Sequence, residues 1–264
     1  MYLLRITERF LAALLSSTQS LARKLERSED ESIRDSERFW TDSENGDLKT
    51  IMHWRGHGPF SDDLWLGLGR QNFLLFEQAA AWAGIARPLD RIVEWGCGGG
   101  MNAVPFARAA AEYCGVDVNS ESLRETARQV ESEHGGNFIS IKIDAGNPEA
   151  VSAQIPGHCD LFLSTFVFEL LPSPAYGLRV MRIAYDLLRP GGMAIVQIRY
   201  HTGPAAVAIS RRRYAANWVR RTTFAIDEFW GECSSIGFTP LFVKLMPVLP
   251  ELDEEHYAYF AMMK

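Results

Sequence analysis

A glycine-rich turn between a short apolar strand and a helix-compatible run constrains this chain more than any other segment. The turn lies within residues 91–103, which read R-I-V-E-W-G-C-G-G-G-M-N-A. Glycine is needed where φ is positive, or where a ligand approaches the backbone more closely than a Cβ allows. The helix after the turn directs free N–H groups at whatever binds there. The segment therefore predicts a site for a nucleotide-like ligand.

Strands and helices are predicted to alternate after residue 88. Apolar runs predict strands at 91–95, 113–118, 138–143, 160–164, 193–199, 239–246 and 255–263. Amphipathic runs predict helices at 103–112, 120–134, 146–154, 176–188 and 227–236. This alternation is typical of an α/β fold with a parallel sheet and helices on both faces.

The first 88 residues are predicted to form a separate helical extension that caps the pocket. Apolar residues at helical spacing predict an amphipathic helix over 3–27, which packs on its own domain or builds a homodimer. Residues 28–47 are rich in serine and charge and predict a linker, and 71–83 predict a helix. Residues 51–68 are dense in Trp, His, Gly and Pro, which favours the lining of a pocket.

Charge and cysteine usage exclude several classes of protein. A net charge of −6 argues against binding of duplex nucleic acid, which requires a basic face. The four cysteines form no C-x-x-C pair, as expected for reduced thiols in a cytoplasmic protein. No stretch approaches the roughly 20 apolar residues that a membrane span needs, so no stable membrane insertion is expected. His53 and His57 have ligand-like spacing, but the glycines and proline around them argue against a metal site.

Two classes of cofactor bind at a glycine turn after the first strand, and the residues here distinguish them. A dinucleotide turn of the form G-x-G-x-x-G needs a third glycine, but the position counted from Gly96 holds Met101. Glu94 instead precedes the glycines, where its carboxylate can accept hydrogen bonds from an ammonium group and would repel a pyrophosphate. An NAD(P)-dependent oxidoreductase with an atypical turn and a non-catalytic cofactor-binding scaffold subunit are the alternatives.

Five motifs together resemble those of the class I S-adenosylmethionine-dependent methyltransferases. They are residues 94–100 (E-W-G-C-G-G-G), 115–117 (G-V-D), 143–145 (I-D-A), 160–172 (D-L-F-L-S-T-F-V-F-E-L-L-P) and 188–192 (L-R-P-G-G). They occur in the family's order within 89–264. The resemblance implies a methyltransferase domain over that range. It also implies a doubly wound, seven-stranded, mostly parallel Rossmann-like sheet of order 3-2-1-4-5-7-6, with the last strand antiparallel.

The resemblance implies S-adenosylmethionine as the cofactor and assigns residues to its parts. Glu94 and the glycine backbone would hold the methionine part, and Asp117 would accept both ribose hydroxyls. Asp144 would accept from the adenine amino group, and the end of the fourth strand would border the methyl group. The implied cofactor residues are Glu94, Gly96, Cys97, Gly98, Asp117, Val118, Asp144, Ala145, Ser164, Thr165, Phe166 and Arg70.

A general base is expected outside the cofactor motifs, because an acceptor that carries a proton must lose it. His201, after the fifth predicted strand, is the first candidate, and His53 and His57 are the second. Glu169 stands where many relatives have a histidine and is a further candidate. A structural role is the alternative for each histidine.

The substrate is expected to be a small molecule. Five arginines within 211–221 predict either a solvated helix face or a lid insertion, at 202–224, that binds an anion through forked guanidinium groups. The predicted substrate contacts are Trp54, Arg55, Trp65, Tyr200, Arg212 and Tyr214. The predicted activity is methyl transfer to O or N of a small, polar, anionic metabolite in a biosynthetic pathway.

Overall fold

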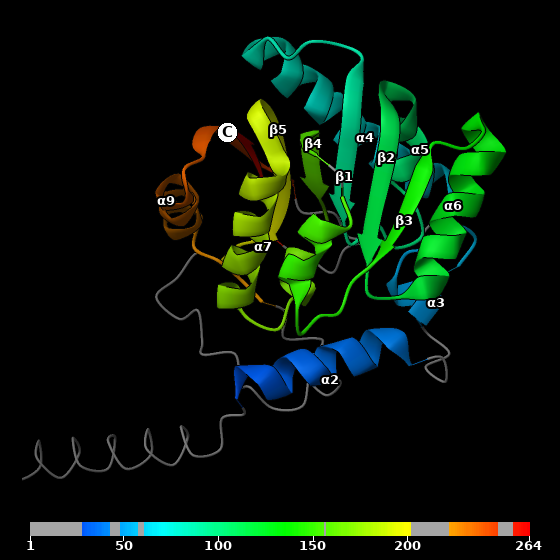
Figure 1. The fold of residues 1–264 in the computed structure, drawn as a ribbon, viewed down its shortest axis with the longest axis horizontal. Helices are drawn as coiled ribbons and strands as arrows, with labels where there is room; N and C mark the ends of the chain where they lie inside the picture. Colours follow the sequence, from blue (N-terminus) through cyan, green and yellow to red (C-terminus); the bar gives the residue numbers. More distant parts are fainter. Residues whose placement is uncertain (1–27, 43–47, 58–60, 156, 202–221, 248–255) are drawn as a thin grey trace, which may run out of the picture.

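The computed structural model describes residues 28–42, 48–57, 61–155, 157–201, 222–247 and 256–264 (Figure 1). The predicted helix at 3–27, with the homodimer expected through it, lies outside these residues. So does most of the predicted lid insertion, including Arg212 and Tyr214. Within the described ranges, no helix is both long enough and apolar enough to cross a membrane. The division into two parts at residue 88 stays a prediction.

Seven strands form one sheet in the predicted order, β3-β2-β1-β4-β5-β7-β6 (Figure 1). The strands are β1 Leu89–Trp95, β2 Ala110–Asp117, β3 Phe138–Lys142, β4 Cys159–Ser164, β5 Leu188–Arg199, β6 Thr239–Leu245 and β7 Tyr257–Met263. β1 to β5 pair in parallel, and β7 runs antiparallel to both β5 and β6. The predicted fold class is confirmed.

Helices cover both faces of the sheet. α4 Asp62–Ala83, α5 Ala103–Phe106 and α6 Ser120–His134 form one layer, and α7 Pro174–Leu187 and α9 Ile226–Ile236 form the other. Every residue of β4 is buried, because its side chains point alternately into the two layers. Leu161 and Leu163 pack in the core on the α4 side, whereas Phe162 packs in the core on the α7 side.

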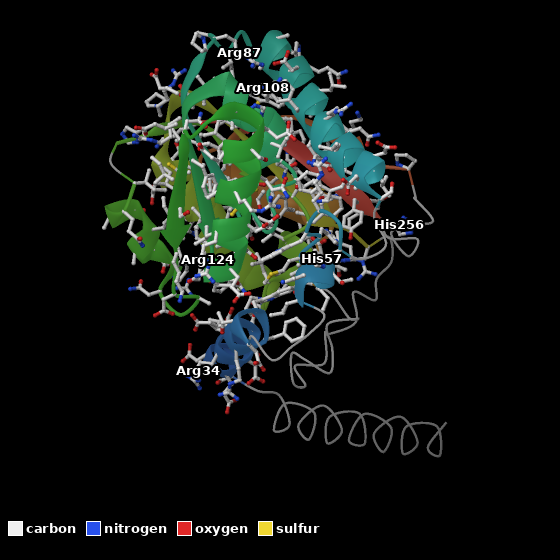
Figure 2. The ribbon with its side chains drawn as sticks, turned by 90° about the vertical axis from the view of Figure 1, so that its right-hand side faces the viewer. Arg34, His57, Arg87, Arg108, Arg124 and His256 are labelled. Carbon is white, nitrogen blue, oxygen red and sulfur yellow. The ribbon has the colours of Figure 1, made fainter. Side chains whose placement is uncertain are left out.

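The predicted linker at 28–47 is wrong over most of its length, because it contains helix α2, Glu29–Thr41. A capping box begins this helix: Glu31 N–H donates to Ser28 Oγ at 3.2 Å, and Ser28 N–H donates to the Glu31 carboxylate at 2.9 Å. α2 crosses beneath the carboxyl ends of the strands (Figure 1), and Arg34 projects from its outer side (Figure 2). Asn119 Nδ2 donates to the Trp40 carbonyl at 2.6 Å, which ties α2 to the end of β2.

Several other predicted elements differ in extent or type, most clearly three of the helices. The helix expected at 103–112 ends at Phe106 and continues as one 3-10 turn, because β1 begins at Leu89 and pairs β2 from Ala110. The helix expected at 71–83 begins earlier, after its N-cap Ser61, whose Oγ accepts from Leu64 N–H. Position 69 of this helix requires glycine, because the helix passes close to Met101. A Cβ at Gly69 would lie 2.2 Å from the Met101 carbonyl oxygen. The helix expected at 146–154 is a 3-10 helix, Pro148–Ala153.

Candidate functional site

A cavity lies at the carboxyl ends of β1, β2 and β4, next to α2. In an open α/β sheet, this is the edge at which ligands bind. The structure brings nine of the predicted cofactor residues to its wall: Glu94, Gly96, Cys97, Gly98, Asp117, Val118, Ala145, Thr165 and Phe166. α2 adds Ser36 and Trp40, and the short helix α3, Leu48–Ile51, with the residues after it adds Ile51, Met52 and His53.

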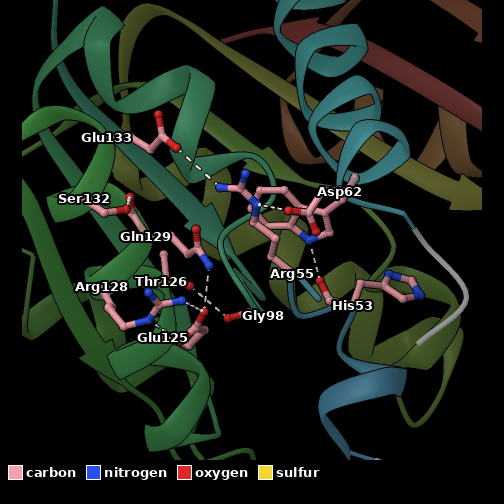
Figure 3. Close-up of polar contacts among 11 residues, drawn as sticks. His53, Arg55, Asp62, Gly98, Glu125, Thr126, Arg128, Gln129, Ser132 and Glu133 are labelled. Atoms are coloured by element: carbon pink, nitrogen blue, oxygen red, sulfur yellow. Dashed lines mark hydrogen bonds and ion pairs between the residues drawn. The ribbon is translucent and has the colours of Figure 1, made fainter. Parts of the chain in front are cut away.

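The glycine turn forms the floor of this cavity. Gly96 has φ 75°, and its N–H donates to the Val116 carbonyl at 2.7 Å, which joins the turn to β2. A Cβ on Gly96 would lie 2.4 Å from Val167 Cγ2, so the position requires glycine on two grounds. Thr126 of α6 donates its hydroxyl to the Gly98 carbonyl at 2.8 Å (Figure 3). The turn is therefore held from both sides.

Asp117 ends β2 at the cavity wall and is 8% exposed. One carboxylate oxygen accepts from Gly98 N–H at 3.0 Å, and the other accepts from Asn119 N–H at 2.8 Å. Burial raises the pKa of Asp117 to about 6, against the lowering effect of these backbone donors. The carboxylate thus organises the turn as well as facing the cavity.

Glu94 is more deeply buried than Asp117, at 2% exposed, and still lines the cavity. Its carboxylate accepts from Tyr113 O–H at 2.6 Å and from Asn102 Nδ2 at 2.7 Å. Burial raises the pKa of Glu94 to about 8, although the two donors act to lower it. A cationic group in the cavity would compensate the charge that burial disfavours.

Three residues of the predicted cofactor set lie away from the cavity wall. Ser164 is buried and donates its hydroxyl to the Trp95 carbonyl at 3.0 Å, which ties β4 to β1. Asp144 is exposed and accepts from Gly146 N–H, while its neighbours Ile143 and Ala145 line the cavity. Arg70 is exposed on α4. The structure gives none of these three side chains a place in the cavity.

The histidine candidates separate by position. His53 lines the cavity with φ 53°, and its ring lies 5.9 Å from that of Phe166, which also has positive φ. The buried Trp65 donates its indole N–H to the His53 carbonyl at 2.6 Å (Figure 3). His57 is exposed beside α3 (Figure 2), and His201 lies in another hollow beside α9, with Nδ1 3.1 Å from Thr223 Oγ1. Of these three histidines, only His53 lines the cavity.

Glu169 belongs to the structural framework. It is buried, and its Oε1 accepts from Tyr257 O–H at 3.2 Å, while its backbone carbonyl accepts from Thr222 N–H at 2.8 Å. It does not line the cavity. These contacts place its carboxyl group in the packed interior, and its role as a catalytic candidate stays a prediction.

The predicted substrate contacts that the structure describes also lie outside the cavity wall. Arg55 binds Asp62 at 3.1 Å and Glu133 at 3.4 Å, and so links α4 to α6 (Figure 3). Trp65 is 1% exposed and forms part of the core, and Trp54 packs against Gly99. The rings of Tyr200 and His256 lie 5.4 Å apart at an angle of 41°, beside the end of β5. Composition alone did not distinguish core aromatic residues from residues that line a pocket.

The cavity wall also contains residues that the sequence did not single out, among them Trp40, Met52, Asn102, Leu170 and Tyr176. Trp40 and Met52 come from segments far from the motifs in sequence. Leu170 lies within the motif at 160–172, and Tyr176 follows it closely. Asn102 follows the glycine turn directly. A polar residue at the start of the helix after such a turn was a signal that could have been used.

Residues 93–194, from β1 into β5, match a protein-family model described as a methyltransferase domain. The chain is 28% identical to the ubiquinone biosynthesis O-methyltransferase of Ralstonia nicotianae over 160 residues, 60% of this chain and 64% of that protein. It is 28% identical to the protein of the same name from Ruegeria pomeroyi over 183 residues, 67% of this chain and 70% of that protein. The chain thus spans less than two thirds of the Ralstonia relative.

Solved structures share the fold at low identity. Magnesium protoporphyrin IX methyltransferase from Synechocystis PCC 6803, with bound SAH, has a TM-score of 0.60 at 14% identity, and the match covers 90% of this chain and all of that one. The N-methyltransferase NodS from Bradyrhizobium japonicum, with bound S-adenosylhomocysteine, has a TM-score of 0.55 at 14% identity and covers 77% of this chain and 93% of that one. At these identities the likeness concerns the fold alone.

Proposed function

The chain belongs to the class I S-adenosylmethionine-dependent methyltransferase family, and we propose that it transfers the cofactor's methyl group to an oxygen of a small polar metabolite. The observation that carries the proposal is the single cavity wall on which Glu94, the glycine turn, Asp117 and Thr165 converge. The ubiquinone biosynthesis O-methyltransferases among the relatives support oxygen as the acceptor. The five arginines of 211–221, outside the described residues, support an anionic acceptor. The names of the same relatives support a place in a biosynthetic pathway.

The residues present fit S-adenosylmethionine. Asp117 offers carboxylate oxygens where the ribose hydroxyls need acceptors, and Glu94 offers a buried acceptor for the methionine ammonium group. When bound, the cofactor supplies an electrophilic methyl group on a sulfonium. The protein's part is to hold the acceptor oxygen in line with it and to exclude water.

His53 is the residue that we assign to proton removal from the acceptor hydroxyl. Its ring borders the cavity beside Phe166, and the bond from Trp65 to its carbonyl holds its backbone in an uncommon conformation. Such strain is often concentrated at functional sites. A neutral imidazole there can accept the proton as the methyl group is transferred.

The other two candidate functions receive less support. A nicotinamide cofactor would need a glycine where Met101 lines the cavity, and it would place a pyrophosphate near Glu94. A scaffold subunit would bind S-adenosylmethionine without turnover. Incubation with isotope-labelled S-adenosylmethionine and fractionated polar metabolites, followed by mass spectrometry of labelled products, distinguishes the three. Binding of NADH, or cofactor binding without any labelled product, would count against the proposal.

We expect His53→Gln to lower the turnover number roughly 100-fold, the lower end of what a general base contributes. Affinity for S-adenosylmethionine should change little, because Glu94 and Asp117 are intact. The matched control is His201→Gln, which replaces a histidine in a different hollow and should keep most of the activity. Rates are measured with the acceptor identified by mass spectrometry, and affinities by calorimetry. Equal loss in both variants would refute the assignment to His53.

We expect the affinity for S-adenosylmethionine to rise about tenfold between pH 6.5 and 8. In the free protein the pKa of Glu94 is about 8, so the carboxyl is mostly protonated below that pH, and binding of an ammonium group requires it to release the proton. The pKa values of Tyr113 and Cys97 lie well above their ordinary values through burial, so these two groups stay neutral over this range. Asp117, with a pKa of about 6, adds to the same trend at the acid end.

Calorimetry in two buffers of different ionisation enthalpy measures both the affinity and the proton released. Glu94→Gln should bind more weakly and lose most of the dependence between pH 7 and 8. An affinity of the unmodified protein that stays constant over this range would contradict the role of Glu94.

A further inference from the structure

A continuous chain of buried hydrogen bonds lies between the sheet and the α4–α5 layer, beneath the glycine turn. Tyr259 O–H of β7 donates to Asn72 Oδ1 of α4 at 2.6 Å, and Asn72 Nδ2 donates to Asn102 Oδ1 at 2.7 Å. Asn102 Nδ2 then donates both to Glu94 at 2.7 Å and to Thr165 Oγ1 at 2.8 Å. All five side chains are buried, so each of these bonds is shielded from water.

The direction of this chain follows from its end at Glu94. With an ammonium group bound, Glu94 is ionised and its carboxylate can only accept, so Asn102 turns its amide nitrogen toward Glu94 and its amide oxygen away. That oxygen needs a donor, which Asn72 provides, and Tyr259 in turn fixes the orientation of the Asn72 amide. Asn102 uses both N–H donors and its oxygen in these contacts, so its orientation is determined by its neighbours.

Thr165 receives the other branch of the chain. Since its Oγ1 accepts from Asn102, its own O–H is left to act as a donor, and Thr165 lines the cavity at the end of β4. Glu94 and Thr165 thus present an acceptor and a donor near each other, because both contact the same Asn102 amide. A zwitterionic amino acid carries the complementary pair, an ammonium group and a carboxylate.

We propose that Asn72, Asn102 and Tyr259 are positioning residues that hold Glu94 and Thr165 in the arrangement that recognises the amino-acid portion of the cofactor. This proposal rests on the proposed function, since it specifies which part of the cofactor binds at the Glu94 end of the cavity. Asn72 and Tyr259 do not line the cavity, so they act through Asn102. The ligand selectivity of the site is set in part by residues of α4 and β7 that never touch the ligand.

Two nucleosides test the assignment, since they differ only in the amino-acid portion. S-adenosylhomocysteine carries it, whereas 5′-methylthioadenosine keeps the adenosine and the thioether without it. We expect Asn72→Leu to weaken binding of S-adenosylhomocysteine roughly tenfold and binding of 5′-methylthioadenosine less than twofold. Tyr259→Phe removes a single hydroxyl and should show the same selectivity, with a smaller loss of about threefold.

Asn137→Leu is the matched control. Asn137 Nδ2 donates to the carbonyls of Ala107 and Ala110 at 2.8 and 2.9 Å, at the opposite end of the strands, so its loss removes an amide of similar size without touching the network. It should leave the ratio of the two affinities unchanged. Unfolding curves of all variants show that each is folded, and Tyr259→Phe keeps the test available should Asn72→Leu not fold.

Equal weakening of both nucleosides by Asn72→Leu and Tyr259→Phe, or no weakening of either, would overturn the positioning role while leaving the proposed function intact. Failure of the unmodified protein to bind either nucleoside would instead overturn the proposed function. Preserved binding of 5′-methylthioadenosine with loss of S-adenosylhomocysteine in both variants supports the inference.

Discussion

Replacement of Asp117 by alanine is expected to lower the affinity for S-adenosylmethionine roughly 1,000-fold, the largest effect on binding of any single change considered. Two hydrogen bonds from ribose hydroxyls to a carboxylate are lost, and each bond to a charged group contributes about 1.5–3 kcal/mol. The change also leaves Gly98 N–H and Asn119 N–H without their acceptor, so the glycine turn itself loses support. Calorimetry at pH 7.5, where the carboxyl is ionised, measures the loss.

Asp144→Ala provides the comparison for Asp117→Ala. Both aspartates belong to motifs of the family, but Asp144 is exposed and its carboxylate accepts from Gly146 N–H in its own turn. We expect its removal to change the affinity only a few-fold, the scale of one exposed local hydrogen bond. A similar loss of affinity in both variants would show that lining the cavity does not make Asp117 more important than Asp144 for binding. It would contradict the role assigned to Asp117.

The fold was predictable because a parallel sheet imposes a strong pattern on its sequence. β4 is buried on both faces, and its centre, 161–163, is an uninterrupted apolar run, while the glycine turn marks the junction of β1 with the next helix. The order of motifs along the chain then determined which strand ends carry Glu94 and Asp117. The apolar run of β4 and the glycine turn are both local signals, and each is recognised within about ten residues.

Helix α2 was missed because its composition obscured its periodicity. Charged residues and serines suggested a linker, yet Ile33, Ser36 and Trp40 recur at helical spacing, and Ser28 with Glu31 forms a capping box. The sequence contained these signals. α2 contributes Ser36 and Trp40 to the cavity, so the omission affected the candidate site as well as the fold.

The ranking of the histidines could not be obtained from the sequence. His53 differs from His57 and His201 through its contacts with Trp65 and Phe166, and the latter lies more than a hundred residues away. The roles of Arg55 and Trp65 could not be obtained from the sequence either. Arg55 forms ion pairs with α4 and α6, and Trp65 is buried in the core, and both properties arise only from tertiary packing. Motifs identify the residues around a cofactor, whereas tertiary packing determines those that meet the substrate.

Gly96→Ala is expected to destabilise the protein by about 2–5 kcal/mol. Two costs add: an L-residue in the left-handed region costs about 1–2 kcal/mol, and overpacking costs about 1–3 kcal/mol. The first follows from the φ of 75°, and the second from a Cβ that would lie 2.4 Å from Val167 Cγ2. Gly96 also lines the cavity, so cofactor affinity should fall with stability. Urea unfolding measures the change in free energy.

Gly191→Ala separates the two costs, because Gly191 has the same φ of 75° and a Cβ added there would meet nothing within 4 Å beyond its chain neighbours. It should lose only the conformational part, about 1–2 kcal/mol. Val167→Ala combined with Gly96→Ala should recover part of the contact cost, so that the double variant is more stable than the sum of the single changes. Equal destabilisation by Gly96→Ala and Gly191→Ala would show that the turn accepts a side chain, and that backbone conformation alone explains the glycine.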